Sequence, residues 1–371
     1  MSNFFSKLAN SGVQNLSPYQ PGKPVSALER EYGVSNVVKL ASNENPLGPS
    51  PRVIKAITNG LDETARYPDG NGFELKHKLA KIFQLEENQI TLGNGSNDVL
   101  EIIARTFASA TDEIMFSEHA FAVYPIVTQA IGAKANVVKA RKWGHDLPAM
   151  AAAITSKTKI IFLANPNNPT GTWFSESELS TFLKAIPENI IIVLDEAYFE
   201  FASHPEYGQK TYPNGIEYLS QYDNLIVTRT FSKAYGLAGL RVGFSVSHPD
   251  IANLLNRVRQ PFNVNQLALV AAETVLDDVD YLEKSIILNA KQMQVYVNVL
   301  TNAGIEYIPS AGNFICVKVE RSADVYEALL KRGIIVRPVA NYLMPDYLRI
   351  SIGSESENRH CLDALLAIVK K

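Results

Sequence analysis

Three groups of polar residues follow short apolar runs of the chain, and their side chains are of the kinds that enzymes use for chemistry. Residues 165–171 read Asn-Pro-Asn-Asn-Pro-Thr-Gly, residues 195–198 read Asp-Glu-Ala-Tyr, and residues 230–233 read Thr-Phe-Ser-Lys. Ligands of open α/β sheets bind at the carboxyl ends of the strands. If the apolar runs are neighbouring strands, these amide, carboxylate, phenol and amine groups meet in one site.

A fourth group, Gly-Asn-Gly-Ser-Asn at residues 93–97, stands at the start of a predicted helix. Backbone N–H groups and the helix dipole suit that position to a phosphate. The group lacks the third glycine of the dinucleotide-binding fingerprint, and the chain has no Gly-Lys-Ser/Thr phosphate loop. The pattern therefore argues against the common nucleotide-binding sites, including that of an NAD-dependent oxidoreductase.

Each group alone also has an ordinary structural explanation. The Asn-Pro repeat is typical of a turn, Asp195 could be a helix N-cap, and a single lysine such as Lys233 is usually solvated. Catalysis is favoured by the order of the groups: an amide, then an acid with a phenol, then a lysine followed by Arg241, after three consecutive apolar runs.

The elements that must position these groups alternate between helix and strand. Helical spacing of apolar residues predicts helices over 74–85 and 99–107, and Ser175 with Glu178 forms a capping box that opens another helix. The runs at 159–164, 190–194 and 225–228 are short and lack polar alternation. Such strands are typical of a parallel sheet that is covered on both faces.

The two ends of the chain do not follow this alternation of helix and strand. The first forty-odd residues are rich in proline and are expected to form an irregular arm. Beyond residue 262, two helical stretches over 266–300 precede strands at 314–319, 334–336 and 347–352 and a final helix, which predicts a smaller α+β domain. We expect an N-terminal arm with part of the small domain (1–45), a large domain (46–262) and a C-terminal small domain (263–371).

Composition narrows the class of protein. The chain has 371 residues, a formal net charge of −3 and two cysteines. Near-neutral charge argues against nucleic-acid binding through a basic surface, and two cysteines argue against a disulfide framework. The scattered histidines lack metal-ligand spacing and are expected to be partly exposed, so no metal is predicted. Cys316 is expected to be buried and inert. With no apolar stretch of membrane length, we expect a cytoplasmic protein.

Together, these motifs resemble those of the fold-type I, pyridoxal phosphate-dependent aminotransferases, and within that family those of the branch that acts on histidinol phosphate. The resemblance covers nearly the whole chain, from Leu-Ser-Pro-Tyr-Gln at 16–20 to Leu-Arg-Ile-Ser-Ile-Gly at 348–353. It implies an α/β large domain with a mostly parallel sheet flanked by helices, and a smaller α+β domain. Its cofactor would be pyridoxal 5′-phosphate.

The resemblance also implies roles for individual residues. Lys233 would bind the cofactor covalently and move protons, and Asp195 would keep its pyridine nitrogen protonated. Phe121 would stack on the ring, with Tyr124 as the fallback. The remaining cofactor-binding residues implied are Asn168 and Tyr198 at the phenolic oxygen, and Gly95, Ser96, Asn97, Ser232 and Arg241 around the phosphate.

For the substrate, the resemblance implies Arg349 and Arg337 as partners of its phosphate, with Tyr19, Asn43 and Tyr67 completing the site. Tyr67 would reach the active site of a neighbouring subunit, so a homodimer with shared sites is expected. Two arginines also match the carboxylates of glutamate. No nucleic-acid or membrane partner is implied.

The reaction implied is the conversion of imidazole-acetol phosphate and L-glutamate to L-histidinol phosphate and 2-oxoglutarate. Alternatives within the family are an aromatic or broad-specificity aminotransferase and a threonine-phosphate decarboxylase. A non-catalytic regulator that keeps the fold as a sensor is a further alternative. It is disfavoured because Lys233 is present and the first forty residues are expected to be too short and too irregular for a winged helix.

Overall fold

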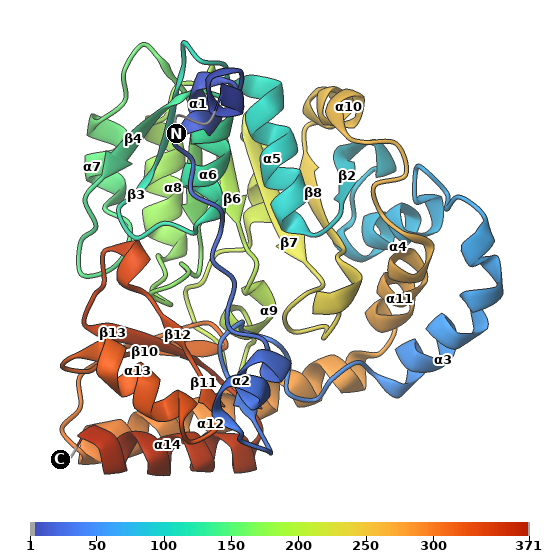
Figure 1. The fold of residues 1–371 in the computed structure, drawn as a ribbon. Coiled ribbons are helices and arrows are strands. Elements are labelled where there is room, and N and C mark those ends of the chain that lie inside the picture. Colours follow the sequence, from blue (N-terminus) through green and yellow to red (C-terminus); the bar gives the residue numbers. More distant parts are fainter. Residues whose placement is uncertain (1–3, 370–371) are drawn as a thin grey trace.

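A large sheet of seven strands forms the centre of the computed structural model, which describes residues 4–369 (Figure 1). Its strand order is β2-β8-β7-β6-β5-β3-β4, and every neighbouring pair is parallel except those made by β8. The predicted mostly parallel sheet is thus confirmed. The strands are β2 Ile90–Gly93, β3 Glu113–Ser117, β4 Lys134–Val138, β5 Thr158–Ala164, β6 Ile191–Asp195, β7 Leu225–Thr230 and β8 Gly243–Ser247.

Helices cover both faces of this sheet, which explains why its strands lack polar alternation. Along β5, Ile161 and Leu163 join one apolar cluster while Ile160 and Phe162 join another on the opposite face. The first face is covered by α3 Pro51–Asn59, α4 Phe73–Phe83, α7 Leu147–Ala152, α8 Glu176–Ala185 and α11 Gln266–Leu276. The second face is covered by α5 Ser96–Phe107, α6 Val123–Ala130 and α10 Pro249–Val258.

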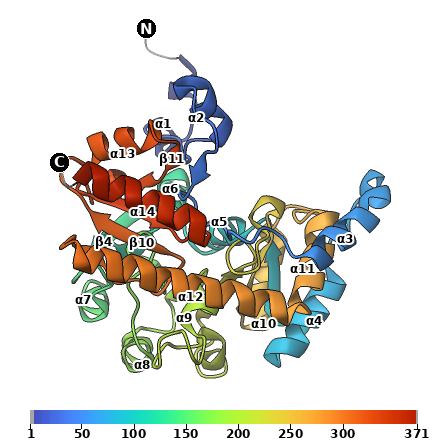
Figure 2. The ribbon, with the colours of Figure 1, turned by 90° about the horizontal axis from the view of Figure 1, so that it is seen from below.

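A second, smaller sheet lies below the carboxyl ends of the large one (Figure 1). Its order is β12-β13-β10-β9, all antiparallel, from Arg337–Pro338, Tyr347–Ser351, Phe314–Lys318 and Tyr307–Ile308. Beneath it, α14 Glu355–Val369 lies beside the long α12 Val279–Asn302, with α13 Ser322–Leu330 close by (Figure 2). The C-terminal strands and helices predicted from the sequence are therefore present.

Both ends of the chain contribute to this smaller unit. Strand β1, Val38–Lys39, pairs in parallel with β11, Ile334–Ile335. In contrast, α11 lies just beyond the expected boundary at residue 262 and packs against α3 and α4 in the core of the large sheet. The division into domains stays a prediction.

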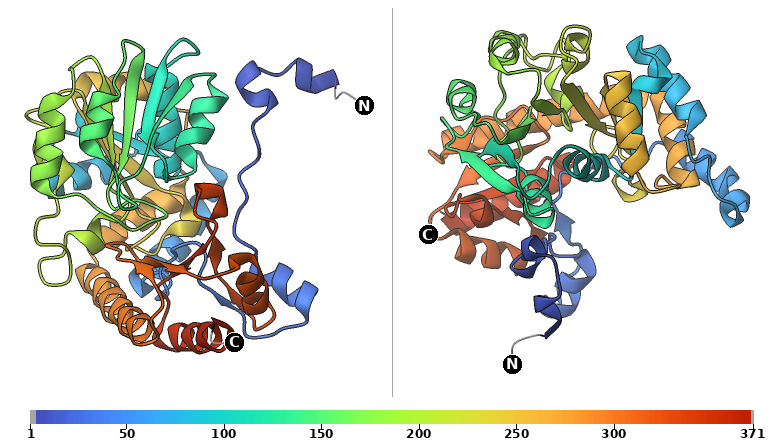
Figure 3. Two further views of the ribbon diagram at one scale, coloured as in Figure 1. Left: turned by 90° about the vertical axis from the view of Figure 1, so that its left-hand side faces the viewer. Right: turned by 90° about the horizontal axis from the view of Figure 1, so that it is seen from above.

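The N-terminal arm is more regular than the sequence suggested. It holds the short helices η1 Phe4–Lys7 and α1 Ser11–Gln14 and a full helix α2, Val25–Tyr32, and it runs along the side of the molecule (Figure 3). The prolines bound α2 rather than exclude it: Pro24 precedes its first turn, and Gly33 ends it in a left-handed conformation at φ +64°.

The other short elements connect the main ones. They are η2 Leu61–Ala65, η3 Glu87–Gln89, α9 Phe199–Ala202, η4 Gly215–Tyr218, η5 Ala238–Leu240 and η6 Ala340–Tyr342. In the part of the chain that the structure describes, none of the helices has the length and apolar character that crossing a bilayer requires.

The capping box predicted from Ser175 and Glu178 is present at the start of α8, and its contribution to stability can be measured. Ser175 accepts a hydrogen bond from the Glu178 backbone N–H, and the Glu178 carboxylate accepts one from the Ser175 backbone N–H. We expect Ser175→Ala to lower the free energy of unfolding in urea by about 1 kcal/mol, because an N-terminal donor loses its partner. Thr181→Ala, at an exposed position of the same helix, is the control and should change it by less than about 0.5 kcal/mol. Equal effects would contradict the capping role.

Candidate active site

A cavity of about 300 Å³ lies where the carboxyl ends of β5, β6 and β7 face the smaller sheet. Its wall brings together nearly all the residues that the sequence singled out, from positions 19 to 349. The predicted residues in the wall are Tyr19, Asn43, Ser96, Asn97, Phe121, Asn168, Asp195, Tyr198, Ser232, Lys233, Arg241, Arg337 and Arg349.

Two predicted residues lie outside the wall. Gly95 sits just behind it, and a Cβ there would lie 2.3 Å from a guanidinium nitrogen of Arg241, in a left-handed conformation with φ +83°. Only glycine therefore lets Arg241 approach the start of α5. Tyr67 is the other: it is 83% exposed and stacks on Phe262, with ring centroids 4.7 Å apart, and the structure does not bring it to this chain's own cavity.

Lys233 follows β7 in the loop that the sequence predicted. Its Nζ donates a hydrogen bond to the Ser42 carbonyl at 3.1 Å. Burial, reinforced by the positive charge of Arg349, lowers the pKa of Lys233 to about 8. A sizeable fraction of neutral amine, the form able to act as nucleophile or base, therefore exists near neutral pH.

Asp195 ends β6 and is almost fully buried. Its Oδ2 accepts a hydrogen bond from the Tyr124 hydroxyl at 2.8 Å, and its Oδ1 accepts one from the Thr228 hydroxyl at 3.2 Å. Burial raises the pKa of Asp195, while these hydroxyl donors oppose that shift. A cation placed beside this carboxylate in the cavity would stabilise its charged form.

Tyr198 is arranged to donate a hydrogen bond into the cavity. Its hydroxyl oxygen accepts from the side-chain amides of Asn43 at 2.9 Å and Asn168 at 3.1 Å. Burial raises the pKa of Tyr198 to about 12, so the hydroxyl keeps its proton. Because both lone pairs are occupied and residues 4–369 supply no acceptor for the O–H, that proton is free for a ligand.

Arg337 and Arg349 stand directly opposite each other on β12 and β13. Arg349 donates to the Asn168 side-chain oxygen at 2.5 Å and to the Ala41 carbonyl at 2.7 Å, while its buried Nε has no partner. Arg337 is 7% exposed and lies over the ring of Tyr19. Like charges opposite each other are unfavourable, so this pair indicates a site for an anion.

Arg241 supplies another cation on the far side of the cavity. It donates to the Ser232 hydroxyl at 3.2 Å and to the Ala238 carbonyl at 3.1 Å, from a left-handed conformation with φ +58° that costs a non-glycine residue free energy. Within residues 4–369, none of the cations of the wall, namely Lys233, Arg241, Arg337 and Arg349, lies within 4.0 Å of a carboxylate oxygen. The cavity is therefore built to receive negative charge.

Sequence reasoning missed several residues here. Tyr342 lines the cavity and Thr228 bonds to Asp195, but neither belongs to a recognisable motif. Ser42, whose carbonyl accepts from Lys233, stands beside the predicted Asn43 but was given no role of its own. Phe121 lines the cavity, whereas Tyr124 lies fully buried behind it with its ring edge-on to that of Phe121.

One histidine is more buried than the sequence suggested. His119 is not partly exposed as expected but is 6% exposed, and its Nδ1 lies 2.8 Å from the Tyr342 carbonyl. It helps to hold the two cavity walls together. Across residues 4–369, no group of three or more His, Cys, Asp or Glu side chains is placed to hold a metal ion. Cys316 is buried as predicted, and burial raises the pKa of its thiol to about 12.

Comparison with known proteins settles the family. The pattern of the family described as aminotransferase class I and II matches residues 35–365. The chain belongs to the class I and II aminotransferase family.

Individual relatives of this aminotransferase are similar over their full length. It is 55% identical to histidinol-phosphate aminotransferase 1 of Mannheimia succiniciproducens over 98% of this chain and 99% of that protein. It is 56% identical to histidinol-phosphate aminotransferase 2 of Pseudomonas aeruginosa over 98% of each chain.

Among solved structures, the histidinol-phosphate aminotransferase of Sinorhizobium meliloti in complex with pyridoxal 5′-phosphate superimposes with a TM-score of 0.88 at 29% identity. The match covers 100% of this chain and 98% of that one. These comparisons confirm the predicted enzyme class, fold and cofactor.

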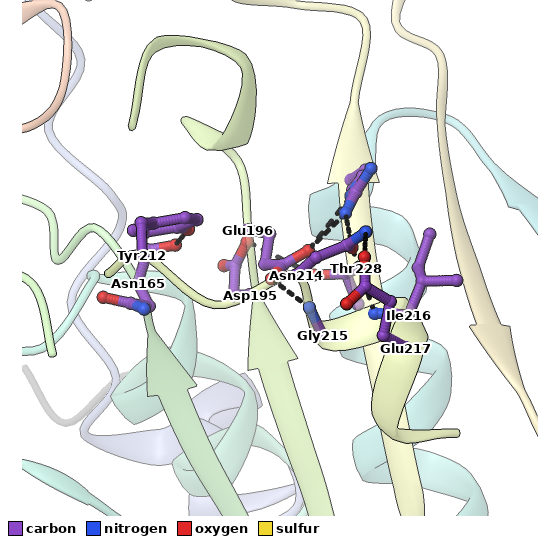
Figure 4. Close-up of polar contacts among 10 residues, drawn as sticks. Asn165, Asp195, Glu196, Tyr212, Asn214, Gly215, Ile216, Glu217 and Thr228 are labelled. Atoms are coloured by element: carbon purple, nitrogen blue, oxygen red, sulfur yellow. Dashed lines mark hydrogen bonds and ion pairs between the residues drawn. The ribbon is translucent and has the colours of Figure 1, made fainter. Parts of the chain in front are cut away.

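Behind the catalytic strands, the aminotransferase carries a buried ion pair. Glu196, next to Asp195, accepts two hydrogen bonds from the Arg229 guanidinium, at 2.8 and 3.0 Å, and one from the Gly215 backbone N–H at 2.8 Å (Figure 4). Asn214 accepts a further bond from Arg229, and the guanidinium lies 3.4 Å over the ring of Phe199. Both carboxylate oxygens of Glu196 and two guanidinium nitrogens of Arg229 thus have partners, which helps to make such burial tolerable.

Removing one partner of this pair should be costly. We expect Arg229→Met to lower the free energy of unfolding by about 3–5 kcal/mol, because the Glu196 carboxylate is left buried without its counter-ion. Lys318→Met, which breaks the exposed pair with Glu306, is the control and should cause no measurable loss. Urea denaturation of both variants checks this, and similar losses would show that burial does not set the cost.

Proposed function

We propose that this aminotransferase converts imidazole-acetol phosphate and L-glutamate to L-histidinol phosphate and 2-oxoglutarate, a step of histidine biosynthesis. The observation that carries the proposal is the arginine pair, Arg337 and Arg349, which faces the cavity without a carboxylate partner among residues 4–369. A substrate phosphate supplies the dianion that two guanidinium groups hold well. Relatives that are 55% and 56% identical over their full length carry the name of this activity.

The residues of the cavity fit pyridoxal 5′-phosphate. Its phosphate would be held at the start of α5 by Gly95, Ser96 and Asn97 together with Ser232 and Arg241, where glycine leaves room for the guanidinium. Its ring would lie against Phe121 and face Asp195, and its phenolic oxygen would accept from Tyr198 and Asn168. When bound, the cofactor supplies an electron sink for the carbanion that forms when a substrate amine loses its Cα proton.

The protein's own groups would manage the charges and protons. Asp195 would hold a proton on the ring nitrogen by remaining negative beside it. Lys233 would bind the cofactor covalently and, once free, would take the Cα proton through its neutral Nζ. The lowered pKa of Lys233, about 8, keeps that form available near neutral pH.

The same arginines would serve both half-reactions. Arg349 and Arg337 would hold the substrate phosphate in one half-reaction and the carboxylates of glutamate in the other. Tyr19 lies against Arg337 and would close the site, and Asn43 keeps Tyr198 in place through its amide. Each substrate would thus be oriented with its amine toward Lys233 before the proton moves.

The alternatives differ in what the arginine pair would hold. An aromatic aminotransferase would use one arginine for the α-carboxylate, and a threonine-phosphate decarboxylase would lose CO₂ instead of exchanging the amine. A solved threonine-phosphate decarboxylase from Porphyromonas gingivalis matches with a TM-score of 0.78, but at 23% identity this concerns the fold alone. A non-catalytic sensor would have no need of Lys233 placed beside Asp195 in a cavity.

Steady-state kinetics distinguish these functions. We expect kcat/KM for histidinol phosphate with 2-oxoglutarate to exceed that for phenylalanine by about tenfold or more, since charged hydrogen bonds contribute about 1.5–3 kcal/mol each. Arg337→Met should remove most of that preference while kcat/KM for phenylalanine changes little, because this ratio reports only the half-reaction with the amine. Faster turnover of phenylalanine, or CO₂ release from threonine phosphate at a comparable rate, would overturn the proposal.

We further propose a cytoplasmic homodimer in which Tyr67 completes the partner's site. Tyr67 stacks on the exposed Phe262, and the stretch of chain around Tyr67 carries further exposed apolar side chains, Ile54, Leu61 and Phe73. A surface of this kind favours a protein partner, and a second copy of this chain would cover it. The two cysteines, both unpaired, are in keeping with a reducing compartment.

Mixing inactive variants tests the shared site. Lys233→Ala and Tyr67→Ala are each expected to lose most activity, and co-expression should restore part of it, because a mixed dimer keeps one site with both residues intact. Co-expression of Lys233→Ala with Asp195→Asn is the control and should restore none, since both residues belong to the same cavity. No recovery in verified Tyr67/Lys233 mixed dimers would overturn the sharing of Tyr67 but not the reaction.

A further inference from the structure

Tyr124 is a buried residue that contacts the proposed site without lining its cavity. It lies in α6, is fully buried, and is absent from the cavity wall. Its hydroxyl nonetheless donates to Asp195 Oδ2 at 2.8 Å. It therefore acts on the cavity only through other residues.

The ring of Tyr124 is held rigidly. It stacks on Phe162 of β5 with centroids 4.6 Å apart and planes within 8°. It also meets the edge-on ring of Phe121, at 5.9 Å and 88°, and the tilted ring of Phe116, at 6.5 Å and 50°. Phe121 lines the cavity. Because an aromatic side chain packed in this way has little freedom, the position of its hydroxyl oxygen beside Asp195 is fixed as well.

The hydrogen bond has a defined electrostatic effect on Asp195. Donation from a hydroxyl favours the charged carboxylate, whereas burial opposes it. Burial and Asp195 together raise the pKa of Tyr124 well above its usual value, so the shared proton stays on the phenol. The other groups that act on the carboxylate are Thr228 on β7, Lys233 and the backbone of Ala197, and Asp195 in turn acts on Tyr198 and Glu196.

We propose that Tyr124 is a positioning residue for transamination: it fixes the orientation of the Asp195 carboxylate toward the cavity, and its ring backs Phe121 on the same wall. One side chain thereby links the two groups that would meet the cofactor ring, one at its nitrogen and one at its face. The inference rests on the proposed role of Asp195.

A double-mutant cycle on the holoenzyme tests this. We measure the dissociation constant of pyridoxal 5′-phosphate for the unaltered protein, Tyr124→Phe, Asp195→Asn and the double variant, by equilibrium dialysis across pH 5–9. Tyr124→Phe should weaken binding by about tenfold or more, since it removes a hydrogen bond to a charged group. In the Asp195→Asn background the same change should have little further effect, because residues that act through one another are not additive.

The pH profile adds a readout that packing alone would not move. A carboxylate that loses a hydrogen-bond donor binds a proton more tightly, so its charge is lost at a higher pH. The acid side of the affinity profile of Tyr124→Phe should therefore move to higher pH. Tyr296→Phe, at an equally buried tyrosine in the core of the smaller unit, is the matched control and should leave both constant and profile unchanged.

The possible results distinguish the positioning role of Tyr124 from the role of Asp195. Unchanged affinity and an unchanged profile in Tyr124→Phe, with Asp195→Asn impaired, would overturn the positioning role alone. Equal losses from Tyr124→Phe in both backgrounds would assign the residue to packing and overturn it too. Full affinity in Asp195→Asn would overturn the role of Asp195 and this inference together, while leaving the substrate assignment to its own kinetic test.

Discussion

The cations around the cavity are the constraint on which the rest of the structure depends. Lys233, Arg241, Arg337 and Arg349 all face one small space, and within residues 4–369 no carboxylate approaches them to salt-bridge distance. Buried charges without counter-ions are unfavourable, so the fold must hold them by other means. It does so with carbonyl oxygens and amides: Ser42 for Lys233, Ala41 and Asn168 for Arg349, and Ala238 for Arg241.

The arrangement of the two sheets follows from that need. The parallel strands β5, β6 and β7 end at one edge, so the amides, Asp195 and Lys233 converge from three separate segments. The antiparallel pair β12–β13 then places two arginines at opposite register positions. Neither sheet alone could surround an anion, and Asn43, held at φ +54° between Tyr198 and Ser351, joins the two. Because Asn43 connects the two sheets through these hydrogen bonds, a residue near the start of the chain belongs to the site.

Much of this could be predicted from the sequence, because strand ends carry motifs. The groups at 165–171, 195–198 and 230–233 identified the edge of the sheet, and the missing alternation in the strands indicated that both faces are covered. Tyr124 and Thr228 could not be assigned in the same way. Their contacts with Asp195 depend on the register between β6 and β7 and on how α6 packs, and these are tertiary facts with no local signature. Helix α2 was missed because prolines mark helix starts as well as irregular segments.

The hydrogen bonds between Asn43 and Ser351 join positions that are 308 residues apart. The bond from Arg349 to the Ala41 carbonyl spans the same number of residues. During synthesis the N-terminal half of such a contact emerges from the ribosome long before its partner exists. The large sheet can begin to fold as its own strands appear, but the cavity has only part of its wall until the last strand, β13, has been made. Assembly of a complete active site is therefore an event of the finished chain. A truncated product ending before residue 349 would carry Lys233 and Asp195 without the Arg349 side of the cavity.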